Sequence, residues 1–109
     1  MNWRKLTSVS EFDDILMQSQ SNGSAFILFK HSTRCMISTM ALRAFEAEYK
    51  SELPTYFVDL IKYREVSNHI AKTTGVIHQS PQVMTIHKGD VVYHDSHSDI
   101  CGVSAGKIG

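Results

Sequence analysis

The apolar run Ala25-Phe26-Ile27-Leu28-Phe29 constrains the fold more than any other stretch of this sequence. Five consecutive apolar residues without alternation are typical of a strand that is buried on both faces, as in parallel and mixed sheets. Helical periodicity precedes the run and returns after it, from about Cys35 to Lys50. A buried strand between two helices indicates a crossover arrangement, in which helices cover both faces of a central sheet.

The rest of the chain extends this pattern. We expect a short strand at 3–6, a helix opened by a Ser8–Glu11 capping box and ended by the polar run 19–23, a strand at 56–60, a helix at 65–74 stopped by Gly75, a hairpin of strands 83–87 and 91–94, and a weak final helix capped by Ser98. No repeat or linker interrupts the pattern. We therefore predict a single α/β domain over residues 1–109, with a central mixed sheet flanked by helices.

The helix that begins near Cys35 is expected to pack through one apolar face. The residues assigned to that face are Ile37, Met40, Ala41, Ala44 and Phe45. Met17, Met36 and Met84 also fall at positions that favour core packing rather than a cofactor site.

Charge and composition exclude several classes of protein. Eleven basic residues balance eleven acidic ones, so no net field draws the chain to nucleic acid or to an anionic membrane. No segment has the apolar length of a signal-peptide core or of a membrane span. The two cysteines are too few and too far apart for the disulfide framework of a small secreted domain. We therefore expect a cytoplasmic protein with reduced thiols and with neither nucleic-acid nor membrane partners.

Cys35 stands where the buried strand gives way to a helix, within the stretch FKHSTRCMISTM. The unpaired N–H groups and the positive end of that helix favour a thiolate, which is the nucleophile in disulfide exchange. Arg34 adds positive potential, and His31 is near enough in sequence to do the same unless its side chain points elsewhere. Ser38, one helical turn after Cys35, is placed to donate a hydroxyl hydrogen bond to the sulfur. The alternative is an inert, packed cysteine at the start of a helix.

The spacing Cys-x-x-Ser has the geometry of a dithiol redox site without its second sulfur. A dithiol site resolves a mixed disulfide internally, whereas a monothiol site needs a second thiol from solution. The pattern therefore indicates exchange of a small thiol on and off protein cysteines. Ser80-Pro81 precedes a strand, and a cis peptide bond there would hold the backbone open as a docking edge beside the thiol.

Three motifs resemble those of the bacilliredoxin C or YtxJ-like family, the monothiol redox proteins of the bacillithiol system. They are FKHSTRCMIS, TGVIHQSPQ and YHDSHSDI, and the likeness extends from about Ser8 to Ile100. The resemblance implies a thioredoxin-like fold and removal of bacillithiol from protein mixed disulfides. It also implies action on S-thiolated cytosolic proteins, with no cofactor other than bacillithiol or a similar low-molecular-weight thiol as co-substrate. A monomer is the default expectation.

By motif position, the resemblance assigns Cys35 as the nucleophile and Ser38 as a partner of the thiolate. The substrate-binding residues would be Ser80 and Pro81, which form the docking segment, and Thr33, Arg34 and Gln82 at its rim. Met36 departs from the proline that usually follows the family's cysteine; it restores one N–H near the sulfur and loosens the helix entry. His78 also matches a family position, for which we expect only local hydrogen bonding.

The second cysteine, Cys101, lies outside the family motifs in a glycine-rich tail. A small, half-buried structural residue is the plainer interpretation. The alternative is that Cys101 resolves Cys35 or links two chains, which requires Cα atoms within about 7 Å. No metal site is expected, because the spacing of His87, His94, His97 and Cys101 does not match the paired short intervals of zinc sites.

Two classes of function remain open. One is a monothiol oxidoreductase that acts on protein mixed disulfides; the other is a thioredoxin-fold sensor or adaptor that stores a small-thiol adduct without turnover. An arsenate-reductase-like variant is the weaker third, because Arg34 alone is near enough in sequence to hold an oxyanion. The reactivity of Cys35 separates the first two, since catalysis requires a reactive thiolate.

Overall fold

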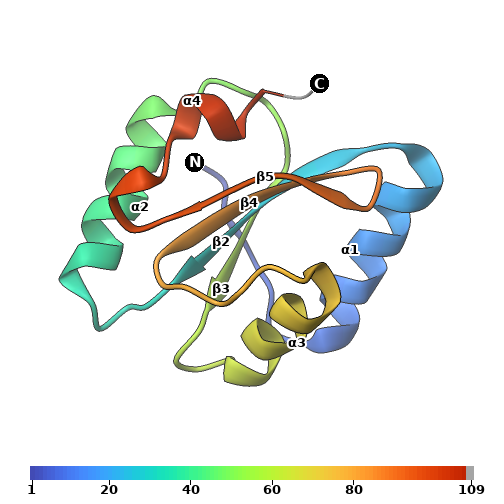
Figure 1. Cartoon of the computed structure of the whole chain (residues 1–109), viewed down its shortest axis with the longest axis horizontal. Coiled ribbons are helices and arrows are strands. Elements are labelled where there is room, and N and C mark those ends of the chain that lie inside the picture. The colour runs from blue at the N-terminus through green and yellow to red at the C-terminus, as the bar shows by residue number, and fades with distance from the viewer. Residues whose placement is uncertain (108–109) are drawn as a thin grey trace.

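A five-stranded mixed sheet organises the computed structural model, which describes residues 1–107 (Figure 1). Along the chain the elements are β1 (Arg4–Lys5), α1 (Val9–Asn22), β2 (Ala25–His31), α2 (Met36–Glu48), β3 (Thr55–Asp59), α3 (Arg64–Thr74), β4 (Gln82–His87), β5 (Asp90–Ser96), the 3-10 turn η1 (His97–Asp99) and α4 (Gly102–Ala105). The strands, the three long helices and the hairpin all occur where the sequence pattern predicts them.

The strands lie in the order β1-β3-β2-β4-β5 across the sheet. β2 is central, with β3 parallel on one side and β4 antiparallel on the other. Figure 1 shows α2 and α4 on one side of the sheet and α1 and α3 on the other. The predicted mixed sheet with helices on both faces is therefore confirmed, and its carboxyl end at β2 leads directly to Cys35.

β2 is the most deeply buried element. All seven of its residues are buried, and the strand continues two residues past Phe29, to His31. Successive side chains point to opposite faces, so the last two residues enter different layers. Lys30 reaches Ser67 on α3, whereas His31 reaches Ser38 on α2. Polar side chains therefore complete an otherwise apolar strand at the end nearest the thiol.

α1 continues through the polar run that was expected to end it. The predicted cap at its start is present, because the Glu11 backbone N–H donates to the Ser8 hydroxyl at 3.2 Å. Ser19 is buried, and its hydroxyl donates to the carbonyl of Ser24 at 2.6 Å while accepting from the N–H of Gly89 at 3.0 Å. The polar run is thus held by one hydrogen bond to the β4–β5 turn and one to the loop that follows α1, and local propensity does not reveal the first of these.

α2 buries less of its surface than its periodicity suggests. Phe45 is fully buried, but Met40 is 64% exposed. Met17 and Met36 are exposed as well, so their expected core positions are wrong, whereas Met84 is buried as expected. The apolar residues of the helix spread further round its circumference than the face that the sheet covers.

The carboxyl-terminal segment differs from the prediction. Ser98 does not cap a helix; it lies within the turn η1, and α4 starts only after Cys101. Gly102, the first residue of α4, packs closely on α2, because a Cβ atom there would lie 2.7 Å from the carbonyl oxygen of Phe45. α4 is four residues long and is followed by Gly106.

Candidate functional site

Cys35 is the N-cap residue of α2 and is half-buried. Its backbone N–H donates to the carbonyl of Ser32 at 3.2 Å, and its own carbonyl accepts from the N–H of Thr39 at 3.1 Å. No acidic residue occupies the first turn of α2, and the sulfur makes no capping hydrogen bond. The positive end of a 13-residue helix therefore acts at the sulfur without a neighbouring carboxylate to oppose it.

Ser38 is fully buried and turns away from the role that the sequence suggests. Its hydroxyl oxygen lies 2.7 Å from Nδ1 of His31 and accepts from the N–H of Ser32 at 3.1 Å. Neither of these hydrogen bonds involves Cys35. The predicted hydrogen bond to the sulfur is therefore absent from this arrangement, although one helical turn still separates the two residues.

His31, expected only as a possible source of positive potential at the thiol, instead hydrogen-bonds to Ser38. Its ring is buried against Phe57, with centroids 5.5 Å apart, and lies 6.4 Å from that of Phe29. Burial lowers the pKa of His31, and the nearby Asp59 carboxylate opposes this by raising it. His31 pairs in register with Asp59 on the adjacent parallel strand, which explains why that carboxylate acts on the imidazole ring.

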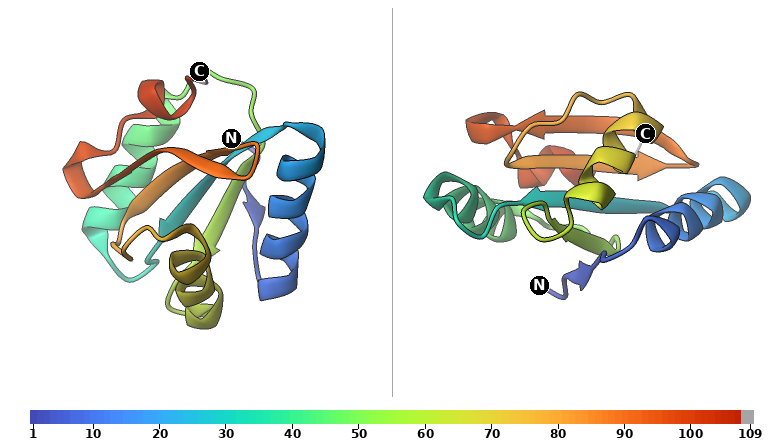
Figure 2. Two further views of the ribbon diagram at one scale, coloured as in Figure 1. Left: turned by 45° about the vertical axis from the view of Figure 1, so that its right-hand side comes forward. Right: turned by 90° about the horizontal axis from the view of Figure 1, so that it is seen from below.

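The segment that leads into β4 lies beside the loop that carries the thiol. The Ser80-Pro81 peptide bond is cis. Lys30 on β2 pairs in register with Gln82 on β4, so Pro81 follows next to His31 at the end of the sheet. Figures 1 and 2 show this segment running alongside the β2–α2 loop. The motifs around positions 35 and 80, far apart in sequence, thus meet at one edge of the molecule.

The predicted substrate-binding residues differ widely in exposure. Thr33 and Arg34 are exposed and Ser80 is half-buried, but Pro81 is buried. Gln82 is only 2% exposed, so its expected place at the rim is wrong. Its amide donates to the carbonyl of residue 77 at 3.0 Å, while its carbonyl oxygen has no hydrogen-bond partner. The side chain of Gln82 points to the face of the sheet that α3 covers, and its hydrogen bond to residue 77 holds the segment before β4 in place.

A buried cation lies in that same layer, and sequence reasoning missed it. Lys30 is completely buried; its ammonium donates to the carbonyl of Ser67 at 3.0 Å and lies 3.3 Å from Nδ1 of His78. Burial lowers the pKa of Lys30 to about 8 and also lowers that of His78. Successive side chains of β2 point to opposite faces, so residue 30 points to the face that α3 covers. A predicted strand that continued past Phe29 would have revealed this buried lysine.

An apolar surface adjoins the thiol on the outer face of α2. Met36 and Ile37 are 78% and 63% exposed, and Met40 continues the surface one turn later. A groove of about 250 Å³ runs between this face and the segment around His97 and Ile100. The backbone N–H of His97 also donates to the carbonyl of Pro81 at 3.0 Å. This hydrogen bond ties the segment that lines the groove to the cis-proline segment.

Cys101 lies at the other end of α2. Its neighbour Gly102 contacts the backbone of Phe45 and Tyr49, about 15 Å along the helix from Cys35 at 1.5 Å per residue. Both cysteines are free. This separation contradicts the suggestion that Cys101 resolves Cys35 in this conformation, because the Cα atoms of a disulfide lie within about 7 Å.

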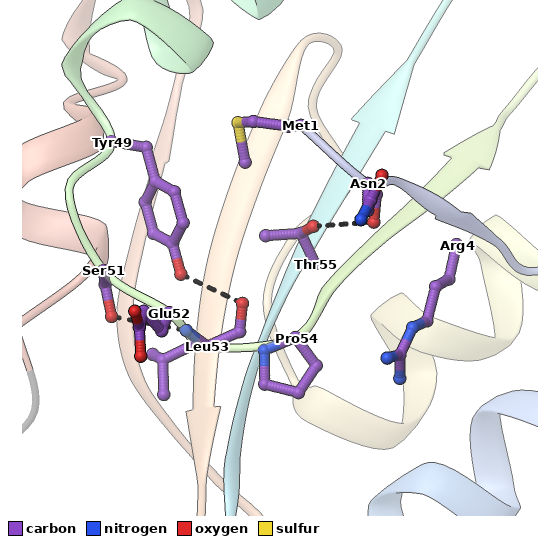
Figure 3. Close-up of a pocket in the computed structure, with 9 residues that line it drawn as sticks. All are labelled: Met1, Asn2, Arg4, Tyr49, Ser51, Glu52, Leu53, Pro54 and Thr55. Atoms are coloured by element: carbon purple, nitrogen blue, oxygen red, sulfur yellow. Dashed lines mark hydrogen bonds between the residues drawn. The ribbon is translucent and has the colours of Figure 1, made fainter.

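Of the remaining cavities, one is lined by Thr33, Asp59 and Tyr63 and adjoins the loop that carries the thiol. The one in Figure 3, of about 400 Å³, is bounded by residues 1–4 and 49–55 at the carboxyl end of α2, and Tyr49 donates there to the carbonyl of Leu53 at 3.1 Å. Within residues 1–107, no three side chains of His, Cys, Asp or Glu are grouped to hold a metal. No helix in the described part of the chain is long and apolar enough to cross a bilayer.

Comparison with known proteins places this geometry in a family. A family model described as "Monothiol bacilliredoxin BrxC" matches residues 4–104. A solved structure, provisionally described as an oxidoreductase with a thioredoxin fold, is 31% identical; the match covers 93% of this chain and 87% of that chain, with a TM-score of 0.78.

Two thioredoxins are also similar in structure. The oxidised thioredoxin of Plasmodium falciparum is 20% identical over 90% of this chain and 88% of that chain, with a TM-score of 0.66. The thioredoxin of Fasciola hepatica is 17% identical over 95% and 99% of the two chains, with a TM-score of 0.68. At these identities the two thioredoxins show the fold alone.

The family match and the oxidoreductase relative agree with the motifs of the sequence and with the thiol at the helix entrance. Together they support a thiol redox function on a thioredoxin-like fold. The chain therefore belongs to the monothiol bacilliredoxin family.

Proposed function

We propose that this protein removes bacillithiol, or a similar small thiol, from protein mixed disulfides through Cys35. The observation that carries the proposal is a single half-buried sulfur at the entrance of α2, with a serine in place of a second cysteine one turn later. Such a site can start a thiol–disulfide exchange but cannot finish it alone.

In the first step, the Cys35 thiolate attacks the sulfur of the small thiol in the mixed disulfide. A new disulfide forms between Cys35 and the small thiol, and the old disulfide bond breaks. Its electron pair leaves with the sulfur of the substrate cysteine, which takes a proton from solvent. The substrate protein is thereby restored to its reduced form.

In the second step, a free small thiol from solution regenerates the protein. Its thiolate attacks the small-thiol sulfur held on Cys35, and the two small thiols leave joined as a disulfide. Cys35 departs as a thiolate, which the helix entrance favours. The small thiol is thus both the group removed and the reductant that is consumed.

The surroundings of Cys35 support docking of an extended substrate segment. Arg34 and Thr33 are exposed on one side of the sulfur, and Ser80 on the cis-proline segment is half-buried nearby. A backbone edge at that segment offers hydrogen bonds to a substrate strand without reading its sequence. Gln82 contributes only indirectly, by holding the segment from beneath.

A thiol sensor or adaptor that holds the adduct without turnover is the second candidate. The exposed Met36 and Ile37 favour this candidate as much as they favour catalysis, because an apolar surface beside the sulfur suits any protein partner. The two candidates differ in the second step, which only an enzyme completes.

A turnover assay separates the two candidates. A one-cysteine protein loaded with bacillithiol is incubated with excess free bacillithiol, and release of the substrate thiol is followed with wild type, Cys35→Ser and Cys101→Ser. We expect Cys35→Ser to fall to background, a loss of at least about a hundredfold, while Cys101→Ser stays within about twofold of wild type. The same substrate loaded with glutathione tests which small thiol is preferred.

Two results would contradict the enzyme proposal. Wild type that releases no more substrate thiol than the buffer would end it. A single equivalent of release, with the adduct retained on Cys35 despite excess small thiol, would favour the sensor instead.

A further inference from the structure

The hydroxyl of Ser38 lies between an imidazole ring and the end of the helix that carries the sulfur. A serine hydroxyl offers one hydrogen and two lone pairs. One lone pair accepts the N–H of Ser32 at 3.1 Å, and the only other partner is Nδ1 of His31 at 2.7 Å. The direction of this second hydrogen bond depends on whether Nδ1 carries a proton.

Two arrangements of the hydroxyl follow. When Nδ1 is bare, Ser38 donates its hydrogen to His31 and has none for any other group. When Nδ1 carries a proton, His31 donates to Ser38, and the hydroxyl hydrogen is free to point elsewhere. The residue one helical turn back is Cys35, whose backbone N–H donates to the carbonyl of Ser32 at 3.2 Å, so Cys35 and Ser38 both bind the backbone of Ser32.

We propose that His31 is a positioning residue that accepts the proton of the Cys35 thiol through the hydroxyl of Ser38. In this transfer the S–H bond breaks and its proton passes to Oγ of Ser38, while the original hydroxyl proton moves to Nδ1 of His31. The net change converts a thiol and a neutral imidazole into a thiolate and an imidazolium. Ser38 ends as it began, with one hydrogen, now donated to the thiolate.

The surroundings of His31 suit a proton acceptor that holds its charge only briefly. Burial against Phe29 and Phe57 keeps the ring neutral at rest, consistent with a pKa below the usual value, so Nδ1 is available to accept. Asp59 on β3 is the charged group that acts on the ring and favours the imidazolium. From α2, Ser38 hydrogen-bonds to the ring, and the cation of Lys30 points to the opposite face of the sheet.

This inference rests on the proposed function only in taking Cys35 as the reactive sulfur. It explains why the Ser38 hydroxyl is buried and hydrogen-bonded to His31. A simple hydrogen bond from Ser38 to the sulfur would need neither burial nor a histidine. If His31 were merely structural, a folded variant without the imidazole would leave the reactivity of the thiol unaffected.

The test is the rate of alkylation of Cys35 by iodoacetamide from about pH 5 to about pH 9, the range that brackets the titration of histidine and thiol. It is measured in a Cys101→Ser background for the otherwise unchanged chain, His31→Phe, Ser38→Ala and the double variant. We expect either single substitution to slow alkylation near neutral pH by about tenfold, as for loss of a hydrogen bond to a charged group. The double variant should be no slower than the slower single variant, because both act in one relay.

Three comparisons make the result decisive. His69→Ala removes a histidine paired with Asp13 on the surface of α1 and α3, and should leave the pH profile unchanged. His31→Gln retains a side chain able to accept from Ser38 but unable to take up a proton, and should be as slow as His31→Phe. Circular dichroism and thermal unfolding show that each variant is folded; if His31→Phe is not, His31→Gln carries the test.

An unchanged profile in His31→Phe, wild-type rates in His31→Gln, or additive losses in the double variant would each overturn the proposal. Alkylation needs no mixed disulfide, so its outcome is independent of the turnover assay. If the protein shows the expected pH profile but no turnover, the relay stands and the proposed function fails. If it shows turnover without that pH profile, the proposed function stands and the relay fails.

Discussion

The chain contains two Cys-x-x-Ser sequences, and both cysteines are N-cap residues of helices. Cys35 precedes α2 with Ser38 in its first turn, and Cys101 precedes α4 with Ser104 in the same relation. The caps have similar extended backbones, with φ and ψ of −112° and 119° at Cys35 and −130° and 113° at Cys101. Both sulfurs are half-buried and free. The local pattern is therefore the same at the two sites.

The difference lies in what surrounds each pattern. Ser104 hydrogen-bonds to the sulfur of Cys101 and lowers its pKa, whereas Ser38 is turned inward to His31. Cys35 opens a 13-residue helix beside the cis-proline segment, whereas Cys101 opens a helix of four residues packed on the end of α2. A cysteine at a helix entrance becomes a candidate site through its tertiary neighbours, not through the motif alone.

The largest expected effect comes from supplying the missing sulfur. In Ser38→Cys, the new thiol should attack Cys35 in its small-thiol adduct, form an internal disulfide and expel the small thiol. Residues three apart at a helix start are within disulfide reach, and an intramolecular attack should shorten the lifetime of the adduct by at least about a hundredfold. Mass spectrometry of the pre-formed adduct over time measures this.

Ser104→Cys is the matched control for that change. It places a thiol at the same spacing from Cys101, and should leave the lifetime of the Cys35 adduct unchanged. An adduct on Cys35 that decays equally slowly in wild type and in Ser38→Cys would show that position 38 does not face the sulfur during exchange.

A second expected effect concerns the packing at Cys101. Gly102→Ala would place a Cβ 2.7 Å from the Phe45 carbonyl oxygen and 2.8 Å from the Tyr49 nitrogen, so α4 must move away from α2. We expect the free energy of unfolding to fall by about 1–3 kcal/mol, as for other overpacked sites. Urea unfolding measures this loss, and labelling should become faster at Cys101 and not at Cys35. Equal acceleration at both cysteines would contradict the separation of the two sites.

A third effect comes from a charge buried near the Cys35 end of α2. Lys30, beneath the Cys35 end, has a pKa of about 8 in the fold against 10.5 when solvated. Between these values the unfolded chain binds more protons, so the free energy of unfolding should rise with pH through that window, by roughly 3 kcal/mol at about 1.4 kcal/mol per pKa unit. Below it, the buried charge costs stability.

Lys30→Met should remove that rise, which is measured as the difference between the stability–pH profiles of variant and wild type. Methionine retains the volume and leaves no charge buried, so the variant should be at least as stable as wild type near neutral pH. Identical slopes in the two profiles would show that Lys30 is ionised in both states across the window.

The smallest effect is expected at the second motif. Ser104→Ala removes the hydroxyl hydrogen bond that lowers the pKa of Cys101, so less thiolate is present at neutral pH. Alkylation of Cys101 should slow by about two- to fivefold, and that of Cys35 should not change. Peptide mapping after brief labelling measures both rates in one sample. A slower Cys35 in this variant would link the two sites.

Most of the fold could be predicted from the sequence, because hydrophobic periodicity and the capping residues act locally. The apolar run at 25–29 indicated the central strand, and the Ser8 cap and the Gly75 stop marked two helix ends correctly. The errors arise where tertiary contacts override propensity. Ser19, in the polar run, is held by a hydrogen bond to a distant turn, and the last helix packs on α2 through Gly102.

The candidate site was predictable in its members but not in its contacts. Spacing and motif identify Cys35, Ser38 and the Ser80-Pro81 segment, yet no local rule states that the Ser38 hydroxyl bonds to His31. Gln82 was expected at the rim, although its neighbour in register, Lys30, faces the interior and the same alternation turns Gln82 inward. The second Cys-x-x-Ser was visible in the sequence and was overlooked.

The most direct test of this account is to find which sulfur receives the small thiol. The wild-type chain is mixed with one equivalent of a bacillithiolated one-cysteine protein, quenched by acid within seconds and mapped by mass spectrometry. The account predicts bacillithiol on Cys35, with reduced substrate protein appearing in equal amount and Cys101 unmodified. Bacillithiol on Cys101, or a stable disulfide between the substrate protein and this chain with none of the small thiol transferred, would contradict it.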